Sequence, residues 1–481
     1  MPPAPLRTTV NSFDLFDTLI ARRCVTPTAL FEEVERTLDA RGFCALRQAA
    51  EHHVAQSREQ FELRDIYDFM IARNHISATD AQRLMAAELD AEFDNAVPIH
   101  ENLSRVRAGD LVVSDMYLSA DTLRRVLQHV GLHLPVHIFA AAVGKQRGAI
   151  WGHLAANWII VDHLGDNLHS DIETPRRYGV PTTHYAGAQS TPIERTIWSH
   201  GYPTLAQLMR AQRLRNPFAP DSEAATLWRL AAQLNLPLLA LGAMRVRRER
   251  DALGVGKILF SARDCYFLAE IFAALFPTEP IEYVYVSREA LNADAPTVAA
   301  YLRHSGLDDA LICDIAATGG SWLHFATAMK LPCRLFSCVF IDNWSQAKAT
   351  PQQVLASRWL KFSWLTRSSA LRHYTAAIEV LNSAPHPSCK AIRADGAFFS
   401  AIFHADSEFS AATMQPLLQQ QQTALATLRP LRPRLLAELE RPAPDTLYIQ
   451  LLEAISAAPL LNALGKLLRW PPNSGAATET G

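Results

Sequence analysis

The sequence is poor in the features that mark secreted, disulfide-rich or membrane-spanning proteins. Its 481 residues include seven scattered cysteines and no CxxC pair, so we expect neither a disulfide framework nor a structural zinc site. No uninterrupted apolar run approaches the roughly 18 residues of a membrane span. The first residues, MPPAPLRTTV, lack the charged and then apolar pattern of a signal peptide. These absences favour a cytoplasmic protein without a membrane span.

An excess of charge of either sign is also missing. The chain has 46 lysine and arginine residues against 48 aspartate and glutamate residues, a formal net charge of −2. Without a basic surplus there is no reason to expect nucleic acid as a partner. The length exceeds what one ordinary hydrophobic core accommodates, so we expect two or three domains.

The first third of the chain alternates between strand-like and helical patterns. Between about residues 22 and 105, apolar residues recur three to four positions apart in several segments. This spacing predicts a helical insertion, with Thr79 as one of its N-caps. Strands that alternate with helices imply a parallel sheet with crossover connections. The expected strands cover residues 8–13, 110–113, 137–140 and 157–162.

A second alternating region begins near residue 254, where the segments KILFS, EYVYVS, ALICDI and LFSCVFID predict strands. Residues 189–220 are richer in proline and polar residues, so we expect a linker there. The expected organisation is an α/β domain at 1–195, a second α/β domain at 215–345, a mainly helical region at 346–470 and a disordered tail at 471–481.

Chemically useful residues follow the expected strands of the first region. Phosphoryl transfer through an aspartyl intermediate needs a carboxylate nucleophile, a hydroxyl that holds the transferring group, a cation, and acids that bind Mg²⁺. Such groups belong just past the carboxyl ends of parallel strands. The chain supplies them in order: Asp14 and Thr18 in DLFDTL, Ser114 in SDMYLS, Lys145 in VGKQRG, and Asp166 and Asp171 in GDNLHSD.

These four segments resemble the four motifs of the haloacid dehalogenase-like (HAD) superfamily, over about residues 8–190 and including a helical cap. The resemblance implies a Rossmann-like sheet with Asp14 as covalent nucleophile and Ser114 bonding a phosphoryl oxygen. Lys145 would neutralise the nucleophile. Asp166 would bind Mg²⁺ together with Asp14 and the backbone carbonyl of Phe16. Asp171 would bind the metal or support it through a neighbouring ligand.

One position departs from the phosphatase pattern of that superfamily. Two residues after the nucleophile, where those enzymes carry a general acid, stands Phe16, followed by Asp17. Loss of a general acid commonly costs about 10²–10⁴-fold in rate. Three alternatives follow: Asp17 substitutes, the leaving group needs no proton, or the domain is a poor phosphatase.

A second constellation lies in ALICDIAATGGSWL. A glycine-rich loop between a strand and a helix can hold an anion on its backbone N–H groups. The segment resembles the phosphoribosyl-pyrophosphate motif of type I phosphoribosyltransferases, although Cys313 stands where such enzymes carry a first acid. The resemblance implies phosphate or nucleotide binding by Asp314, Thr318, Gly319, Gly320 and Ser321; the alternative is a structural glycine turn.

Other charged residues stand at expected strand ends. Arg263 with Asp264, and Ser287 with Arg288, are placed to line the same cleft, or to form simple ion pairs. We expect structural and not catalytic roles for Glu379 and His386.

The whole layout resembles a group of two-domain HAD-like bacterial proteins, on segments such as SFDLFDTL, SARDCYFL and VYVSREAL. That group is associated with surface-polysaccharide synthesis, which implies a sugar phosphate or nucleotide sugar as substrate.

Three hypotheses for function follow. The leading one is a Mg²⁺-dependent hydrolase or phosphotransferase acting on a small phosphorylated metabolite through Asp14. The second places a phosphoribosyl-type transferase or nucleotide-binding activity in the second domain. The third is a catalytically decayed scaffold or regulatory protein. The sequence identifies no protein partner.

Overall fold

A computed structural model describes residues 7–466 of the chain, except 25, 27, 59, 143, 342–348, 369–371 and 408. The chain divides into two compact units. Unit 1 comprises Met1–Pro192 with Leu214–Pro217, and unit 2 comprises Ile193–Arg213 with Phe218–Gly481. The tail expected at 471–481 lies outside the described residues.

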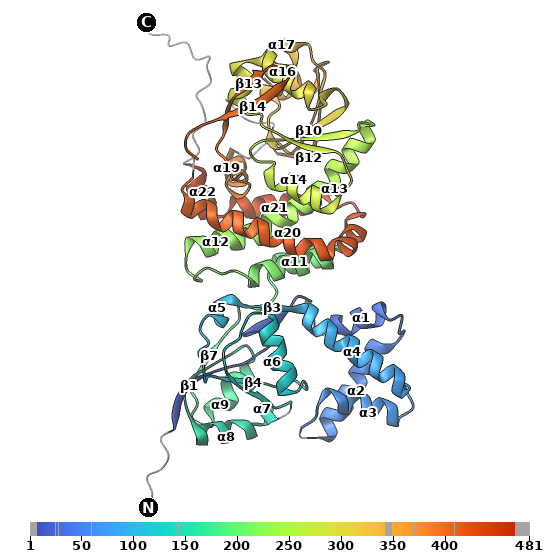
Figure 1. The fold of residues 1–481 in the computed structure, drawn as a ribbon, viewed down its shortest axis with the longest axis vertical. Helices are drawn as coiled ribbons and strands as arrows, with labels where there is room; N and C mark the ends of the chain where they lie inside the picture. Colours follow the sequence, from blue (N-terminus) through green and yellow to red (C-terminus); the bar gives the residue numbers. More distant parts are fainter. Residues whose placement is uncertain are drawn as a thin grey trace, which may run out of the picture. The chain divides into compact units, whose positions relative to one another are not determined.

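Unit 1 is built on a five-stranded parallel sheet in the order β5-β4-β1-β6-β7. Its strands are joined by helices, as the alternating pattern predicts (Figure 1). The strands are β1 (Thr8–Phe13), β4 (Leu111–Ser114), β5 (His137–Ala140), β6 (Trp158–Gly165) and β7 (Thr182–His184). The short and connecting helices are α5 (His100–Leu103), α6 (Ala120–His129), α7 (Gly144–Arg147), α8 (Ala149–Asn157) and α9 (Thr174–Arg176).

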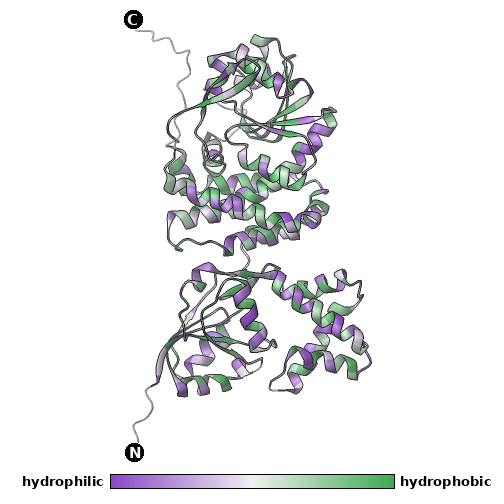
Figure 2. Cartoon of the chain, in the orientation of Figure 1, coloured by the Kyte–Doolittle hydropathy of each residue, from purple (hydrophilic) through white to green (hydrophobic). Residues whose placement is uncertain are grey.

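The described residues of the helical insertion of unit 1 form the helices α1 (Thr28–Thr37), α2 (Phe43–Ser57), α3 (Leu63–Ala72) and α4 (Ala78–Asn95). It enters and leaves through a short antiparallel pair, β2 (Ile20–Arg22) with β3 (Ala96–Pro98). The N-cap of α4 is Ser77, whose side chain accepts from the backbone N–H of Asp80. The expected N-cap at Thr79 was therefore wrong by two residues. Each insertion helix carries hydrophilic and hydrophobic residues side by side (Figure 2), as amphipathic spacing requires.

One hydrophobic core joins the insertion to the sheet. Leu30, Phe31 and Tyr67 of the insertion belong to the same buried cluster as Phe13 and Val112 of the strands. The insertion is thus packed on the carboxyl-end loops rather than tethered by its two short strands alone.

Unit 2 contains a second five-stranded parallel sheet, in the order β12-β11-β10-β8-β9. The expectation of two α/β regions is thereby confirmed. The strands are β8 (Lys257–Ser261), β9 (Ile281–Val284), β10 (Ala310–Ala317), β11 (Cys333–Ile341) and β12 (Leu360–Ser368). The boundary expected at residue 345 was wrong, because β12 pairs with β11 and continues the sheet beyond it.

Helices cover the sheet of unit 2 and a hairpin of β13 (Cys389–Asp395) and β14 (Phe398–Phe403) follows it. The linker expected at 189–220 was wrong as well: it contains α10 (Pro192–Ser199) and α11 (Pro203–Leu214), and Leu205, Leu208 and Met209 of α11 are buried. The other helices are α12 (Glu223–Leu230), α13 (Leu236–Leu253), α14 (Tyr266–Leu275), α15 (Arg288–Ala293), α16 (Ala295–His304), α17 (Gly320–Met329), α18 (Pro351–Leu355), α19 (Arg372–Leu381), α20 (Ala411–Leu439), α21 (Asp445–Ser456) and α22 (Pro459–Gly465).

Within the described part of the chain, no single helix is long and apolar enough to cross a membrane. Helices α21 and α22 meet that criterion only as a pair, with a bend of 71° between them.

Candidate functional site

The sheet of unit 1 changes direction between β1 and β6. From β1 the chain builds outward through β4 to β5, and it then returns to place β6 and β7 on the other side of β1. Loops that leave neighbouring strands toward opposite faces open a crevice at their carboxyl ends, where ligands bind in open α/β sheets. Asp14 follows β1 and its backbone N–H donates to the carbonyl of Leu164 on β6 at 2.8 Å. The expected nucleophile thus stands at this switch point.

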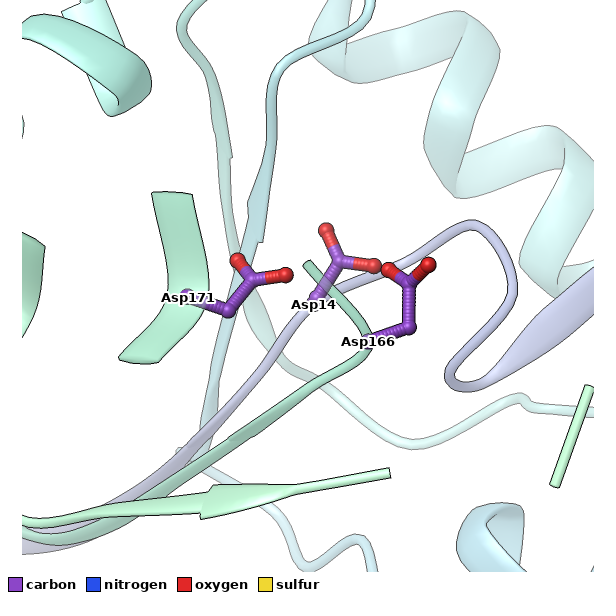
Figure 3. Close-up of side chains that lie close together, drawn as sticks. All are labelled: Asp14, Asp166 and Asp171. Carbon is purple, nitrogen blue, oxygen red and sulfur yellow. The ribbon is translucent and has the colours of Figure 1, made fainter. Parts of the chain in front are cut away.

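Three carboxylates converge there. Asp14, Asp166 and Asp171 each offer an oxygen, and these oxygens all lie within 4.8 Å of one another. Asp14 lies between the other two side chains (Figure 3). Asp14 and Asp171 are buried, with 4% and 1% of their surface exposed, and Asp166 is half-buried. The sequence predicts this convergence from three separate positions in two motifs.

Lys145 supplies the cation of the cluster. It lies on α7 and is buried, and its ammonium group contacts the carboxylate of Asp14 and that of Asp171, the latter at 2.6 Å. Burial by itself lowers the pKa of Lys145, but the charges of Asp14 and Asp171 outweigh it and raise the pKa above its ordinary value. Lys145 is therefore charged at neutral pH.

Asp171 is held by protein groups on both of its oxygens. One oxygen contacts Lys145 at 2.6 Å and His163 Nε2 at 3.4 Å, and the other accepts from the backbone N–H of Asn167 at 2.9 Å. Burial favours a higher pKa, but Lys145 and the hydrogen bond from His163 lower it below the usual range. These contacts fit a carboxylate that fixes Lys145 and the loop after β6.

His163 is a site residue that the sequence analysis did not single out. It is buried on β6, and its Nδ1 lies 2.9 Å from the hydroxyl of Ser12 on β1. Burial lowers its pKa, so the ring is neutral; Nε2 then donates to Asp171 and Nδ1 accepts from Ser12. The signal that was available is a histidine near the end of a largely apolar strand, two residues before Gly165.

Gly165 is required by the close approach of Asp171. A Cβ atom at position 165 would lie 2.4 Å from both Cβ and Cγ of Asp171. Only glycine allows the strand β6 to pass so close to that carboxylate. The glycine of the GDN segment thereby positions Asp171.

Negative charge exceeds positive charge at this edge of the sheet. Burial, followed by the charges of Asp17 and Asp171, raises the pKa of Asp166 to about 7. Burial also raises the pKa of Asp14, which Lys145 only partly offsets. Clustered carboxylate oxygens with surplus negative charge are the donor set that Mg²⁺ prefers. The residues present therefore fit a divalent cation held by Asp14 and Asp166.

The two expected hydroxyl residues lie at the same edge. Ser114 ends β4, the neighbour of β1, and its Oγ accepts from the N–H of Met116 at 3.3 Å. Thr18 is fully buried, and its hydroxyl has no hydrogen-bond partner among the described residues. Its carbonyl accepts from Asn102 at 2.8 Å.

Phe16 is tied to the insertion. The guanidinium of Arg22 lies 4.3 Å from the centre of the Phe16 ring and makes two hydrogen bonds to Glu92 of α4, at 2.7 and 2.8 Å. The ring of Phe16 is therefore half-buried beside a fixed ion pair.

A second buried arginine ties the insertion to the loop that follows Ser114. Arg47 of α2 makes two hydrogen bonds to Glu88 of α4, at 2.7 and 2.9 Å, and lies 4.8 Å from the ring of Tyr117. The hydroxyl of Tyr67 also donates to Glu88, at 2.8 Å. Helix α4 thus braces two loops of the site, the loop that follows β1 and the loop that follows β4.

The second constellation is only partly brought together. Asp314 lies on β10, and burial, with the charge of Asp264, raises its pKa to about 7. Cys313 faces the other side of the strand, in the hydrophobic core. Since neighbouring residues of a strand point to opposite faces, no acid at 313 could share a cleft with Asp314.

The glycine loop has a structural explanation. Gly319 adopts φ +76°, and a Cβ there would lie 2.8 Å from Val354 and 3.0 Å from Phe362. The N–H of Gly320, which begins α17, donates to the hydroxyl of Thr318 at 3.3 Å. Ser321 lies in the first turn of α17. The loop is therefore packed against its neighbours, with one of its N–H groups already satisfied.

Comparison with known proteins adds no family: no protein-family model matches the chain and no curated protein is significantly similar to it. The chemistry of unit 1 is therefore inferred from its residues. A buried carboxylate beside a lysine can attack an electrophile whose negative charge the lysine neutralises.

Proposed function

We propose that unit 1 is a Mg²⁺-dependent hydrolase that acts on a small phosphorylated metabolite through an aspartyl-phosphate on Asp14. The observation that carries the proposal is the position of Asp14. It stands at the switch point of the sheet, in contact with Lys145 on one side and within 4.8 Å of Asp166 on the other. The resemblance of the motifs to the HAD superfamily agrees with this reading.

In the first step an oxygen of Asp14 attacks phosphorus. The new O–P bond forms as the bond from phosphorus to the leaving oxygen breaks, and the leaving group takes that electron pair. Lys145 contacts the carboxylate of Asp14 and opposes the rise in its pKa that burial causes, and its ammonium group would neutralise the negative oxygens of the phosphoryl group. Mg²⁺, when bound to Asp14 and Asp166, would neutralise further charge on those oxygens.

The leaving oxygen needs a proton unless it is already stable as an anion. Phe16 cannot donate one, and its ring is fixed by Arg22. Asp17 follows Phe16 in the chain and lies close enough to Asp166 to contribute to its raised pKa, so we propose that Asp17 in its protonated form is the donor. A substrate with a weakly basic leaving group would not need it.

In the second step water attacks the phosphoryl group on Asp14. The O–P bond to Asp14 breaks, inorganic phosphate leaves and the carboxylate of Asp14 is regenerated, while the water loses its proton to Asp17, which donated its own proton in the first step. Ser114 and Thr18, whose hydroxyl has no hydrogen-bond partner among the described residues, would orient the phosphoryl oxygens and the loop. A hydroxyl acceptor in place of water would make the same site a phosphotransferase.

The rigid insertion favours a small substrate in this proposal. Its helices share a core with the loops of the site and are braced by Arg22 and Arg47, so they form a fixed wall. In this proposal the insertion limits the access of water and contacts the leaving group.

The test is a phosphate-release screen of the full chain against phosphorylated sugars and nucleotides, with Mg²⁺ or with EDTA. Two variants accompany it: Asp14→Asn, and the matched control Asp121→Asn, whose carboxylate is exposed on α6. We expect Mg²⁺-dependent release that Asp14→Asn lacks and Asp121→Asn retains. Equal release by Asp14→Asn would refute the proposal.

A further inference from the structure

The turn between α2 and α3 is the part of the insertion that meets the loop after β4. The backbone N–H of Leu63, the first residue of α3, donates to the carbonyl of Tyr117 at 2.8 Å. The ring of Tyr117 also stacks on that of Phe61, with 6.3 Å between the ring centres. Phe61 is buried, so the turn is anchored on the loop that begins after Ser114.

The same turn reaches the helix that carries Lys145. The amide nitrogen Nε2 of Gln60 lies 3.8 Å from the position that a Cβ atom would take on Gly144, the first residue of α7. Lys145 is the next residue, and its ammonium group contacts the carboxylates of Asp14 and Asp171. Only Gly144 and one lysine side chain thus stand between the amide of Gln60 and the reacting carboxylate.

In the reaction proposed above, the leaving group points away from Asp14, because the attacking and leaving oxygens lie roughly in line on phosphorus. The acidic loop after β6 lies on one side of β1, and the loops after β4 and β5 lie on the other. The turn at Gln60 contacts those two loops. The part of the insertion that meets a leaving group on this side is therefore the turn between α2 and α3.

Gln60 differs from the two glutamines of α2. Gln48 donates to the carbonyl of Cys44 at 3.2 Å, and the amide of Gln56 lies 2.9 Å from Nε2 of His52, so both make contacts within their own helix. Gln60 is exposed, and its amide makes no hydrogen bond to a described residue. Its two N–H donors and its carbonyl acceptor are available to a ligand.

The neighbouring charged groups of the turn are paired with one another. Arg58 forms an ion pair with Asp65 of α3, and the other oxygen of Asp65 accepts from the backbone N–H of Glu62 at 2.8 Å. The polar group of the turn that lies beside α7 is thus a neutral amide. An amide that donates and accepts matches a hydroxyl group, which also does both.

We propose that Gln60 is a specificity-determining residue of the Asp14 site, and that its amide binds a hydroxyl group of the leaving group. The substrate class is then the phosphate ester of a polyhydroxylated molecule such as a sugar, rather than the ester of an aryl or simple alkyl alcohol. This inference rests on the hydrolase proposed above for unit 1. Gln60 contacts the substrate and takes no part in the bond changes at phosphorus.

The test compares two kinds of leaving group, using the full chain with Mg²⁺. The substrates are the best sugar phosphate of the phosphate-release screen, its deoxy analogues, and p-nitrophenyl phosphate, whose leaving group has no further hydroxyl group. The variants are Gln60→Ala and the matched control Gln56→Ala, whose side chain is exposed on α2. The thermal unfolding midpoint of each variant is measured as well.

We expect Gln60→Ala to lower kcat/KM for the sugar phosphate about three- to tenfold, as the loss of one neutral hydrogen bond implies. The loss should appear in KM, because the hydroxyl group is bound in the ground state and in the transition state alike. Turnover of p-nitrophenyl phosphate and the unfolding midpoint should stay at the values of the parent protein. Gln56→Ala should match the parent protein with both substrates.

The deoxy analogues separate a substrate contact from a structural role. In the parent protein, removing the hydroxyl group that Gln60 binds should lower kcat/KM by a similar factor. Gln60→Ala should turn over the sugar phosphate and that analogue equally well, because the partner of the hydroxyl group is already missing. A purely structural role of Gln60 would leave the difference between the two substrates unchanged.

Three results would overturn the inference and leave the hydrolase in place. The first is an equal loss with the sugar phosphate and with p-nitrophenyl phosphate in Gln60→Ala, which would indicate a displaced Lys145. The second is unchanged kinetics of Gln60→Ala with the sugar phosphate. The third is turnover of p-nitrophenyl phosphate without turnover of any sugar phosphate. If no phosphate ester were turned over at all, the hydrolase itself would be refuted, and this inference with it.

Discussion

Replacing Gly165 by alanine should damage unit 1 at one defined contact. The new Cβ would lie 2.4 Å from Cβ and Cγ of Asp171 and 2.6 Å from its Oδ2. Non-bonded carbon atoms rest about 3.5–4.0 Å apart, so Asp171 must retreat by about 1 Å. The backbone of Gly165 is outside the left-handed region, so alanine at this position destabilises the fold through steric crowding and not through backbone strain.

The magnitude follows from what Asp171 holds. Overpacking of this kind costs about 1–3 kcal/mol of stability. Because Asp171 contacts Lys145 and His163, the retreat also misplaces the cation beside Asp14. A displacement of about 1 Å in a catalytic group costs about 10²-fold in rate.

Two measurements on Gly165→Ala check this: the thermal unfolding midpoint by circular dichroism, and Mg²⁺-dependent phosphate release from the best substrate of the screen. The matched control is Gly152→Ala in α8, where the nearest atom to the new Cβ is Tyr178 Cε1 at 3.4 Å. The control should lose neither stability nor rate. If Gly165→Ala kept the unfolding midpoint and the rate of phosphate release of the parent protein, the close contact of Gly165 with Asp171 and the role of Asp171 in positioning Lys145 would be refuted.

Three further predictions concern the same unit. The raised pKa of Asp166 means that, between about pH 4 and about pH 7, the folded chain holds a proton that the unfolded chain releases. In EDTA, the free energy of unfolding should therefore fall as the pH rises through that window. In Asp166→Asn the thermal unfolding midpoint should depend less on pH. An unchanged dependence on pH would contradict the raised pKa of Asp166. His163→Leu should cost about 1–3 kcal/mol by leaving the hydroxyl of Ser12 without the His163 ring and by removing one of the hydrogen bonds to Asp171, whereas His163→Gln, which can still donate to Asp171, should recover most of the midpoint. Glu92→Gln should cost about 3 kcal/mol by leaving Arg22 buried without its charge partner; hydrogen exchange in α4 should speed up, and unchanged exchange would show that the pair does not brace the insertion.

The sequence predicts those features that depend on local pattern. Apolar runs that end in Asp14 and Ser114 locate two strands and their carboxyl ends, and parallel pairing then brings distant loops to one edge. The convergence of Asp14, Asp166 and Asp171 follows from that rule without any knowledge of side-chain packing.

The features that were missed depend on tertiary contacts. His163 gains its role only because Ser12 of another strand and Asp171 of a later loop flank it. The pairing of Arg22 with Glu92 spans 70 residues, and no local spacing encodes it. The segment at 189–220 contains prolines that begin helices rather than break them, since Pro192 and Pro203 stand at first positions.

In the second region, the alternation of side chains along a strand limits what a sequence motif can predict about a binding site. Cys313 and Asp314 are adjacent in sequence, yet Cys313 lies in the hydrophobic core, whereas Asp314 lies near the charges of Asp264 and Arg288. Conversely, Arg263 and Glu379 are far apart in sequence and lie 3.8 Å apart. A motif gives residue order, whereas the fold determines which of those residues can share a ligand.

The central claim is that Asp14 becomes covalently phosphorylated. The most direct measurement is mass spectrometry of the full chain quenched in acid during turnover of p-nitrophenyl phosphate with Mg²⁺, followed by peptide mapping. The account predicts a mass increase of one phosphoryl group on the peptide that contains Asp14, absent from Asp14→Asn and from samples in EDTA. Turnover without that adduct, or an adduct on another residue, would contradict it.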